Sequence, residues 1–520
     1  MDTLTRWISN IFPKWAASRI IGRARLEQAK RYYEAVQVTA SRPRRGNGAS
    51  ADAVNDRSRQ HLREFARWLD ENHDLAVGVL DDLVTNVVGE GAGIEPMALN
   101  SKDRSPAIDF NNQLHDLWLE FWSAPEVTGE LPGAEVERLV CRTLLRDGEL
   151  FIKHQSKQST PFGSLVPYSM ELLEADFCPY WMIDPSTRVV HGIQKDGWGR
   201  PVGYYIFKQH PGSPVFAPPT LETIYISAED MMHLKLANRL HQTRGVSVFH
   251  SVLGRLDDLK DYEESERIAA RIAASLTAFI RRDIAMSDNF TTTTNDDSTK
   301  NYKMEQGMIF DGLMPGEDIG LIDSKRPNPN LINFRDSQVR AIASGTGTRF
   351  SSISKNYSGT YSSQRQELVE AGSHYKRIFD YLRAKFYLPV WKHFVDAIRL
   401  AGLITIPRGI DIASLYRPEI RSPSIPWIDP LKEVSAYRLM VASGFRSRQQ
   451  VIRDLGGDPA TVDAQIETDD FIPKPTEVIG KASDYEKSPE DKKDDSTKDD
   501  EGSSTDDKED GKMNDDAMAA

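Results

Sequence analysis

Residues 313–372 read LMPGEDIGLIDSKRPNPNLINFRDSQVRAIASGTGTRFSSISKNYSGTYSSQRQELVEAG, and this stretch decides how the chain is organised. Pro315 and Gly316 are typical of a turn. Pro327 and Pro329 fix φ at their own positions and favour extended backbone just before them. A loop is therefore expected ahead of residue 334.

Two helices are predicted in the rest of this stretch. The first covers residues 334–344, because Gly345 and Gly347 suit a C-terminal cap. A polar and aromatic segment follows it. The second helix is predicted to run over residues 362–388, where Pro389 comes next. The pattern indicates a long rigid helix that is entered from a loop of small residues.

Length and composition bound the class of protein. A chain of 520 residues exceeds what one core usually holds, so two or more subdomains are expected. Charged residues make up 27% of the chain and no apolar run is long enough for a transmembrane helix, so a soluble protein without a secretory signal is expected. Cys141 and Cys178 are the only cysteines, which favours a reducing compartment and argues against a disulfide framework.

Charge is distributed unevenly along the sequence. The net charge is −12, and residues 481–520 hold 15 Asp and Glu against 7 Lys, a net of −8. Residues 1–45 hold 10 Lys and Arg against 3 acidic residues, a net of +7. The tail is too poor in apolar side chains to fold by itself, so it is expected to be disordered. For the basic residues 1–45 two interpretations are equally good: a solvated surface, or contact with nucleic acid or an acidic partner.

Hydrophobic periodicity predicts an α+β protein that is mostly helical. Alternation predicts strands over residues 149–153, 170–173, 189–194, 202–207, 224–226, 231–235 and 308–313. Helices are expected over residues 14–40, 54–88, 106–121, 134–146, 247–278, 431–443 and 447–455. The glycines of residues 89–93 follow a helix instead of a strand, so they are interpreted as a helix stop and not as a phosphate-binding loop.

The sequence contains no motif for catalysis. Its Gly-Lys pairs lie at residues 480–481 and 511–512 without a preceding strand, so a nucleotide-driven motor is not expected. No HExxH occurs, and His233, within a predicted strand, is interpreted as a hydrogen-bonded core histidine. Neither cysteine has a neighbouring base that would make it a nucleophile. The sequence therefore predicts no enzymatic activity, no catalytic residue, no metal site and no cofactor.

Six stretches in collinear order resemble the portal proteins of lambda-like tailed bacteriophages. The resemblance covers residues 32–469. The stretches are NVVGEGAGIEP, GIQKDGWGRPVGYYIFKQHPG, HLKLANRLHQTRGVSVFHSVL, LMPGEDI, FRDSQVRAIASGTGTRFSSISKNYSGTYSSQR and WIDPLKEVSAYRLMVASGFRSRQQVIRDLGGDP. One of them alone would be a weak signal, but six in order favour this family strongly.

The resemblance implies a portal fold with wing, stem, clip and crown, assembled as a ring around a central channel. A closing ring makes head-to-tail contacts between copies, which would explain the long charged helix predicted over residues 247–278. The implied segments are a basic N-terminal arm and helix (1–50), the wing (51–246), a first stem helix (247–278), the clip (279–333), a second stem helix (334–347), the tunnel loop (348–361), a long wing helix with its continuation (362–402), the crown (403–470) and a disordered acidic tail (471–520).

The implied function is that of a head-to-tail connector at one capsid vertex of the virion, assembled in the host cytoplasm. Double-stranded DNA would be packaged and ejected through its channel. The implied partners are further copies of the chain in a dodecamer, non-specifically bound DNA, the terminase large subunit, major capsid and scaffold proteins, and head-completion proteins, with no membrane. Two alternatives remain open at this point: another connector or adaptor ring of the virion, and a DNA-processing enzyme.

The implied tunnel loop supplies the candidate DNA-facing residues. Hydroxyl, amide and phenol groups can touch phosphates and sugars without reading bases, and cations add attraction that salt screens. An ordinary surface connection is the alternative for this loop. The candidates are Arg349, Lys355, Asn356, Tyr357, Ser358, Thr360 and Tyr361.

Overall fold

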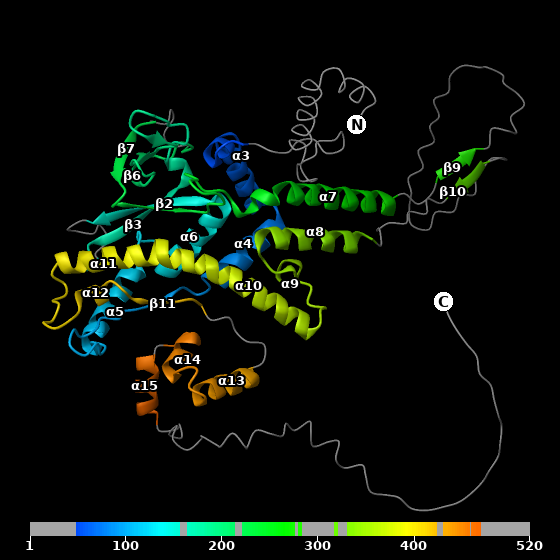
Figure 1. The fold of residues 1–520 in the computed structure, drawn as a ribbon. Helices are drawn as coiled ribbons and strands as arrows, with labels where there is room; N and C mark the ends of the chain where they lie inside the picture. Colours follow the sequence, from blue (N-terminus) through cyan, green and yellow to red (C-terminus); the bar gives the residue numbers. More distant parts are fainter. Residues whose placement is uncertain are drawn as a thin grey trace, which may run out of the picture. The chain divides into compact units, whose positions relative to one another are not determined.

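The computed structural model separates into two units, residues 1–423 and 424–520, which are described one at a time. Figure 1 shows that helices predominate in the first unit, together with antiparallel sheets. Among the described residues, no helix is both long enough and apolar enough to span a bilayer. The structure describes residues 48–156, 164–213, 221–275, 279–282, 317–320, 330–423, 430–457 and 459–469.

Several predicted segments lie outside these described residues. They are the helix at residues 14–40, the strand at residues 308–313, most of the implied clip and the acidic tail. The α+β, mostly helical class predicted for the chain is confirmed by the elements that are described.

The helix predicted over residues 54–88 is in fact two helices, α3 (Ala51–Asn72) and α4 (Asp74–Val87). The chain is extended at His73, with φ −129° and ψ 113°. The His73 side chain explains the break, because its Nδ1 accepts from the Leu75 amide at 3.2 Å and its Nε2 lies 3.0 Å from the Leu256 carbonyl oxygen. Periodicity alone cannot show such a distant partner. The chain turns just after α4, with φ 57° at Gly89, which confirms the interpretation of residues 89–93 as a helix stop.

The predicted strands form two antiparallel sheets in the first unit. β2 lies between β3 and β8, and a four-stranded sheet has the order β4-β5-β6-β7. The predicted strand at residues 189–194 is split into two short strands by a tight turn with positive φ at His191 and Gly192. The bounds are β2 Glu149–Ser156, β3 Tyr168–Glu174, β4 Val189–Val190, β5 Ile193–Lys195, β6 Pro201–Phe207, β7 Thr223–Ser227 and β8 Met231–Lys235.

The main core packs helices on the first of these sheets. α5 (Ile108–Ser123) and α6 (Gly133–Asp147) lie where periodicity predicted them. The Trp118 ring on α5 lies 5.2 Å from Trp391 and 5.1 Å from Phe394, both fully buried. Such aromatic clusters bury large apolar areas and hold helices in fixed register. A short pair of strands, β1 (Gly93–Glu95) and β11 (Glu419–Arg421), closes the same unit.

The two implied stem helices lie side by side, as Figure 1 shows. A 3₁₀ turn at Val248–Ser251 leads into α7 (Leu253–Ser275), and α8 runs over Leu331–Thr346. An ion pair joins Arg335 to Glu263 at 2.7 Å. Beyond them, β9 (Phe279–Arg282) pairs antiparallel with β10 (Glu317–Gly320).

The long helix does not end before Pro389. α10 (Tyr361–Leu382) passes through a π turn at Arg383–Tyr387 into α11 (Leu388–Leu400). The expected stop at residue 388 is therefore wrong. The π turn moves the hydrogen bond of the Leu388 amide to the Arg383 carbonyl, and Pro389, which has no amide hydrogen, falls in the first turn of α11, where none is needed. The short helix α12 (Ile412–Leu415) follows.

The described residues of the second unit form three short helices, α13 (Pro430–Ala442), α14 (Arg448–Asp454) and α15 (Pro459–Thr468). The first two lie where the sequence predicted them. Ser447 and Gln450 form a capping box at the start of α14, which explains why that helix was predictable. α15 was not predicted.

Glu137 on α6 is a buried carboxyl in the middle of the first unit. Its Oε2 accepts from the Ala92 amide at 2.7 Å and from the Tyr387 hydroxyl at 2.9 Å. Its Oε1 has no hydrogen-bond partner among the described residues. Burial raises the pKa of Glu137 to about 7. The protonated form therefore suits the fold better than the charged form.

This raised pKa predicts a loss of stability as the pH rises. A carboxyl whose folded pKa is raised contributes its full stability below its ordinary pKa and loses it as the pH rises through about 7. Glu137→Gln should remove the loss, so at pH 8 the variant should be more stable than the wild type by up to about 3 kcal/mol. Urea unfolding at pH 5 and pH 8 measures the difference. Glu135→Gln, on the exposed side of the same helix, is the control, and equal pH dependence of wild type and Glu137→Gln would contradict the argument.

Candidate functional site

The candidate site is the connection between α8 and α10, residues 347–360, which we call the α8–α10 loop. It begins at Gly347, where φ is 75°. The Thr348 amide donates to the Ala343 carbonyl at 3.1 Å, and the hydroxyls of Thr346 and Thr348 are 2.8 Å apart. Contrary to the expectation of a continuous polar loop, Phe350–Ser354 form a short helix, α9, with Ile353 buried. Only the second half of the connection is an open loop.

That second half, residues 355–360, is the tip of the loop. The Asn356 side-chain oxygen accepts from the amide and the hydroxyl of Ser358 at 3.1 and 2.6 Å, an Asx turn that fixes the backbone. Gln364 on α10 donates to the Tyr357 carbonyl at 2.6 Å. Thr360 caps α10. All six tip residues are exposed, and the Tyr357 side chain is among the most exposed large residues of the unit, at 61%.

The structure brings most of the predicted DNA-facing residues together and separates one from them. Lys355, Asn356, Tyr357, Ser358 and Thr360 share the exposed tip. Tyr361 begins α10, and its side chain lies outside the described part of the chain.

Arg349 lies at the base of the loop instead of the tip. Its Nη2 donates to the Asp82 carboxylate of α4 at 3.0 Å, and its side chain is 22% exposed. Burial alone would lower the pKa of Arg349, but the hydrogen bond and charge of Asp82 raise it. The guanidinium charge is therefore matched by a carboxylate within the same chain.

Asp82 is the residue of this site that sequence reasoning missed. Its side chain is 2% exposed and accepts from the Ser352 hydroxyl at 2.5 Å and the Tyr375 hydroxyl at 2.6 Å, in addition to Arg349. Burial raises the pKa of Tyr375, so that phenol stays protonated and donates. One signal in the sequence could have revealed Asp82. Asp82 lies between Val79 and Leu83 on the apolar face of the predicted helix. A carboxylate buried there requires hydrogen-bonding or charged partners.

Gly347 is needed where α8 turns into the loop. Its φ is in the left-handed region, and a Cβ there would lie 2.6 Å from Nε2 of His374 on α10. Backbone conformation and space therefore both favour glycine at this junction. Close packing of the loop base on α10 depends on it.

We expect Gly347→Ala to destabilise the protein by roughly 1–2 kcal/mol, because alanine is strained in the left-handed region and its methyl group would push against His374. Gly254→Ala on α7 is the matched control, since a Cβ there meets nothing within 4 Å. Urea unfolding of both variants measures the two effects. Equal stability of Gly347→Ala and wild type would mean that the junction relaxes freely.

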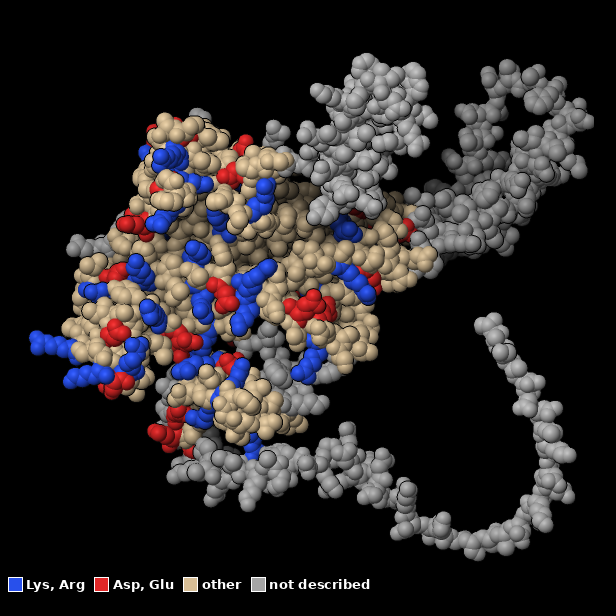
Figure 2. Space-filling view, in the orientation of Figure 1, with Lys and Arg blue, Asp and Glu red and all other residues tan. Residues whose placement is uncertain are grey.

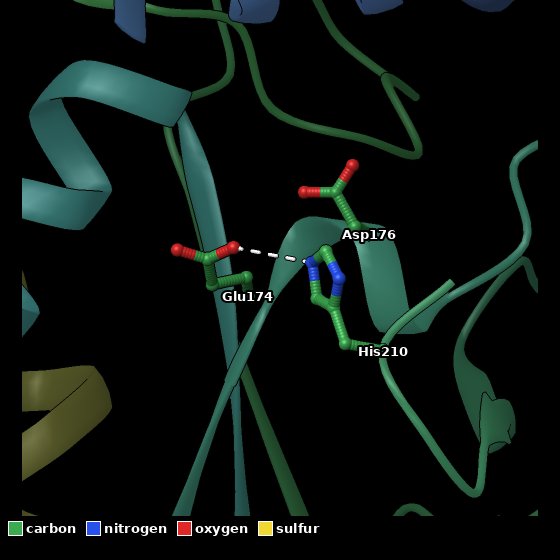
Figure 3. A group of neighbouring side chains, drawn as sticks. All are labelled: Glu174, Asp176 and His210. Atoms are coloured by element: carbon green, nitrogen blue, oxygen red, sulfur yellow. Dashed lines mark ion pairs between the residues drawn. The ribbon is translucent and has the colours of Figure 1, made fainter. Parts of the chain in front are cut away.

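A group of acidic and histidine side chains lies apart from the loop, on the sheet side of the first unit. Figure 3 shows Glu174, Asp176 and His210 close together, with an ion-pair distance of 3.4 Å between His210 and Glu174. Arg67 contacts both carboxylates, at 3.3 Å for Glu174 and 2.7 Å for Asp176, and Arg63 lies 2.7 Å from Asp176. A cation would have to displace these arginines, so we interpret the group as an ion-pair network and assign it no metal.

Two further kinds of buried ionisable group, a histidine–carboxylate–arginine cluster and the two cysteines, show no sign of reactivity. His233 lies 3.0 Å from the Glu149 carboxylate, as expected for a hydrogen-bonded core histidine. Burial alone would raise the pKa of Glu149, but the Arg244 guanidinium at 2.8 Å lowers it well below its ordinary value. Burial raises the pKa of the Cys141 thiol to about 12 and that of Cys178 to about 11, which leaves both unreactive.

Surface charge gives no sign of a tight DNA clamp on the face that Figure 2 shows. Lys and Arg are interspersed there with Asp and Glu instead of forming one basic area. Tight non-specific binding to DNA normally requires clustered cations.

Comparison with known proteins bears directly on the family. The profile described as "Phage portal protein, lambda family" matches residues 39–378. A "Probable portal protein" of Halomonas phage phiHAP-1 is 26% identical over 441 residues, 82% of this chain and 83% of that protein. "Portal protein B" of Escherichia phage lambda is 22% identical over 308 residues, 53% of this chain and 56% of that protein.

Two solved structures are more distant. A structure described as the neck of a native GTA particle computed with C12 symmetry covers 78% of this chain and 94% of its own, at 14% identity and a TM-score of 0.42. An HK97 family phage portal protein from Corynebacterium diphtheriae covers 64% and 95%, at 12% identity and a TM-score of 0.29.

The family match extends over α3 to α8, the α8–α10 loop and most of α10. The chain belongs to the lambda family of phage portal proteins. It is therefore a structural component of the virion and not an enzyme, which sets aside the alternative of a DNA-processing activity.

Proposed function

We propose that twelve copies of this portal protein form a closed ring, and that the α8–α10 loop of each copy lines the channel through which double-stranded DNA passes. In this arrangement the wing covers residues 51–246, α7 and α8 are the stem helices, the clip lies within residues 279–333 and the crown covers residues 403–470. The ring is a passive conduit, and the energy for packaging comes from a separate ATPase.

The observation that carries the proposal is the exposed tip at residues 355–360. Its backbone is fixed by side-chain hydrogen bonds, while its outward groups are hydroxyls, one amide, one phenol and one ammonium. These groups can contact phosphates and sugars without reading bases. The single cation of each tip, Lys355, adds attraction that salt screens. A moving duplex would thus be centred without being held.

Apolar side chains that the single chain leaves exposed support assembly into a ring. The described residues of the second unit include no buried large hydrophobic side chain. Units of this size seldom hold themselves together without further burial. Head-to-tail contact with neighbouring copies would cover these side chains. The exposed ones are Leu431, Val434, Leu439, Met440, Phe445 and Leu455.

The stem helices offer a second surface for neighbouring copies. Ile332 and Phe334 on α8 and Ile268 on α7 are exposed in the single chain, beside the acidic residues Asp258 and Asp261 of α7. A surface that mixes apolar and charged groups suits a contact that closes a ring with defined register.

The further partners follow from the same proposal. The terminase large subunit docks on the clip, head-completion proteins attach after packaging, and capsid and scaffold proteins contact the ring during assembly. The basic residues 1–45 are available for scaffold or DNA, and the acidic tail keeps the crown from adhering to packaged DNA by repulsion.

Electron microscopy of the purified protein tests the ring directly. We expect twelve-fold rings with a central hole wide enough for a DNA duplex, roughly 20–40 Å across. A monomer under all conditions, together with normal capsids when the gene is deleted, would contradict the proposal.

The tip has its own test. Replacing Asn356, Tyr357 and Ser358 together by alanine should leave rings intact, because the tip buries no core side chain, and should lower DNA packaging or retention by about tenfold, the effect of losing roughly 1.4 kcal/mol of contacts. Packaged DNA per particle measures the outcome. A Ser373→Ala variant on the exposed face of α10 serves as control. Normal packaging by the triple variant would remove the proposed role of the tip.

The second unit is tested by Phe445→Ser, which removes its most exposed aromatic side chain. Burial of a large apolar side chain contributes about 1.5–3 kcal/mol, so ring formation should need roughly ten times more protein. Analytical ultracentrifugation measures this, with the equally exposed Leu400→Ser as a matched control outside the unit. If Phe445→Ser lowers the stability of the monomer and leaves ring formation unchanged, the side chain packs within its own chain instead.

A further inference from the structure

We propose that Asp82 is a positioning residue with two roles: it fixes the tip of the α8–α10 loop relative to the wing, and it neutralises Arg349 so that this cation does not grip DNA. The inference rests on the proposed channel position of the loop. Asp82 itself touches no DNA in this proposal.

The geometry of Asp82 links three elements at one carboxylate. Asp82 belongs to α4, Ser352 to α9 and Tyr375 to α10, while Arg349 comes just before α9. Oδ1 accepts from Arg349 and Ser352, and Oδ2 accepts from Tyr375. These elements lie side by side where α10 crosses the end of α4 (Figure 1). A single side chain therefore sets how they meet.

The short helix α9 depends on such external contacts. It has five residues, which is far below the length at which a helix is stable by itself. Its other contacts include the buried Ile353, Phe350 packed against the main core, and a 3.2 Å hydrogen bond from the Ser351 amide to Glu367. Two side chains at the start of and within α9, Arg349 and Ser352, donate hydrogen bonds to the Asp82 carboxylate. The tip begins directly after α9, so its position follows from that anchor.

Charge neutralisation is the second role. Arg349 is partly exposed, and its guanidinium lies next to a loop that we place in the channel. With Asp82 charged, the pair adds no net charge. Without it, each copy would contribute one more cation, and every added phosphate contact steepens the dependence of DNA affinity on salt. A channel that must let DNA slide benefits from the neutral pair.

The experiment compares assembled rings of wild type, Asp82→Asn and Asp81→Asn. Asp81, one residue away, forms a more exposed ion pair with Arg142 and is the matched control. For Asp82→Asn we expect tryptic cleavage after Lys355 to rise about tenfold, because a lost charge-assisted hydrogen bond of roughly 1.5 kcal/mol favours local opening. We also expect a steeper salt dependence of duplex binding. Asp81→Asn should change neither.

Two more variants separate the roles. In Asp82→Asn combined with Arg349→Gln, the extra cation is absent, so the salt dependence should return to that of wild type. Tyr375→Phe removes one donor and leaves the charge pair intact, so it should raise cleavage modestly at unchanged salt dependence. If Asp82→Asn does not assemble, Tyr375→Phe and Ser352→Ala decide the anchoring role. The double variant Asp82→Asn with Arg349→Gln, in which the site keeps zero net charge, should bind DNA as wild type does and decides the neutralising role.

Unchanged cleavage after Lys355 in Asp82→Asn, Tyr375→Phe and Ser352→Ala would overturn the anchoring role. Unchanged salt dependence in Asp82→Asn, or weaker duplex binding by the double variant Asp82→Asn with Arg349→Gln, would overturn the neutralising role. If the loop does not line the channel, a different result is expected from the two sets of variants. The alanine variant of the tip would package DNA normally, while Asp82→Asn would still make the tip more accessible to trypsin.

Discussion

The continuous helix formed by α10, the π turn and α11 is the element on which the rest of the first unit depends. Its second half is anchored in the core, where Trp391 and Phe394 meet Trp118 of α5. Its first half carries Tyr375, which donates to Asp82, and Gln364, which holds the loop tip. Because closely packed helices transmit position along their length, the aromatic core at one end and the Asp82 contacts near the other together set where the tip lies.

The π turn makes this arrangement possible. Pro389 would break a regular α-helix, because it lacks an amide hydrogen and its ring meets the preceding turn. The extra residue of the π turn places Pro389 in the first turn of α11, and Phe386 and Tyr387 of the turn are themselves fully buried. The local irregularity is thus supported by the core, and the helix continues without interruption from the loop through α11 (Figure 1).

Local patterns in the sequence predicted most of the fold, and distant partners account for what they missed. Apolar residues alternate along strands and recur every three or four residues along helices. The positions of elements such as α6 and β6 could therefore be predicted from the sequence. The break at His73 depends on a carbonyl 183 residues away, and the base of the loop depends on a pair, Arg349 and Asp82, that is 267 residues apart. Arg349 and the tip are both polar and adjacent in sequence, so the sequence predicts one common role for them. Nothing in the local sequence indicates that Arg349 is already paired with Asp82.

The distribution of charge in the first unit suits the proposed channel, in which a subunit would be rigid and would bind DNA weakly. Buried charges such as Glu149 with Arg244 and Asp82 with Arg349 are matched inside the chain, where an unpaired charge would be costly. The exposed tip, in contrast, presents mainly neutral hydrogen-bonding groups. Strong electrostatic interactions therefore lie behind the surface, where they fix geometry, and weak polar ones lie on it. A ring that exposed Arg244 and Arg349 at its channel surface would bind DNA more tightly. A duplex passing through that ring would have to break each of those contacts at every step.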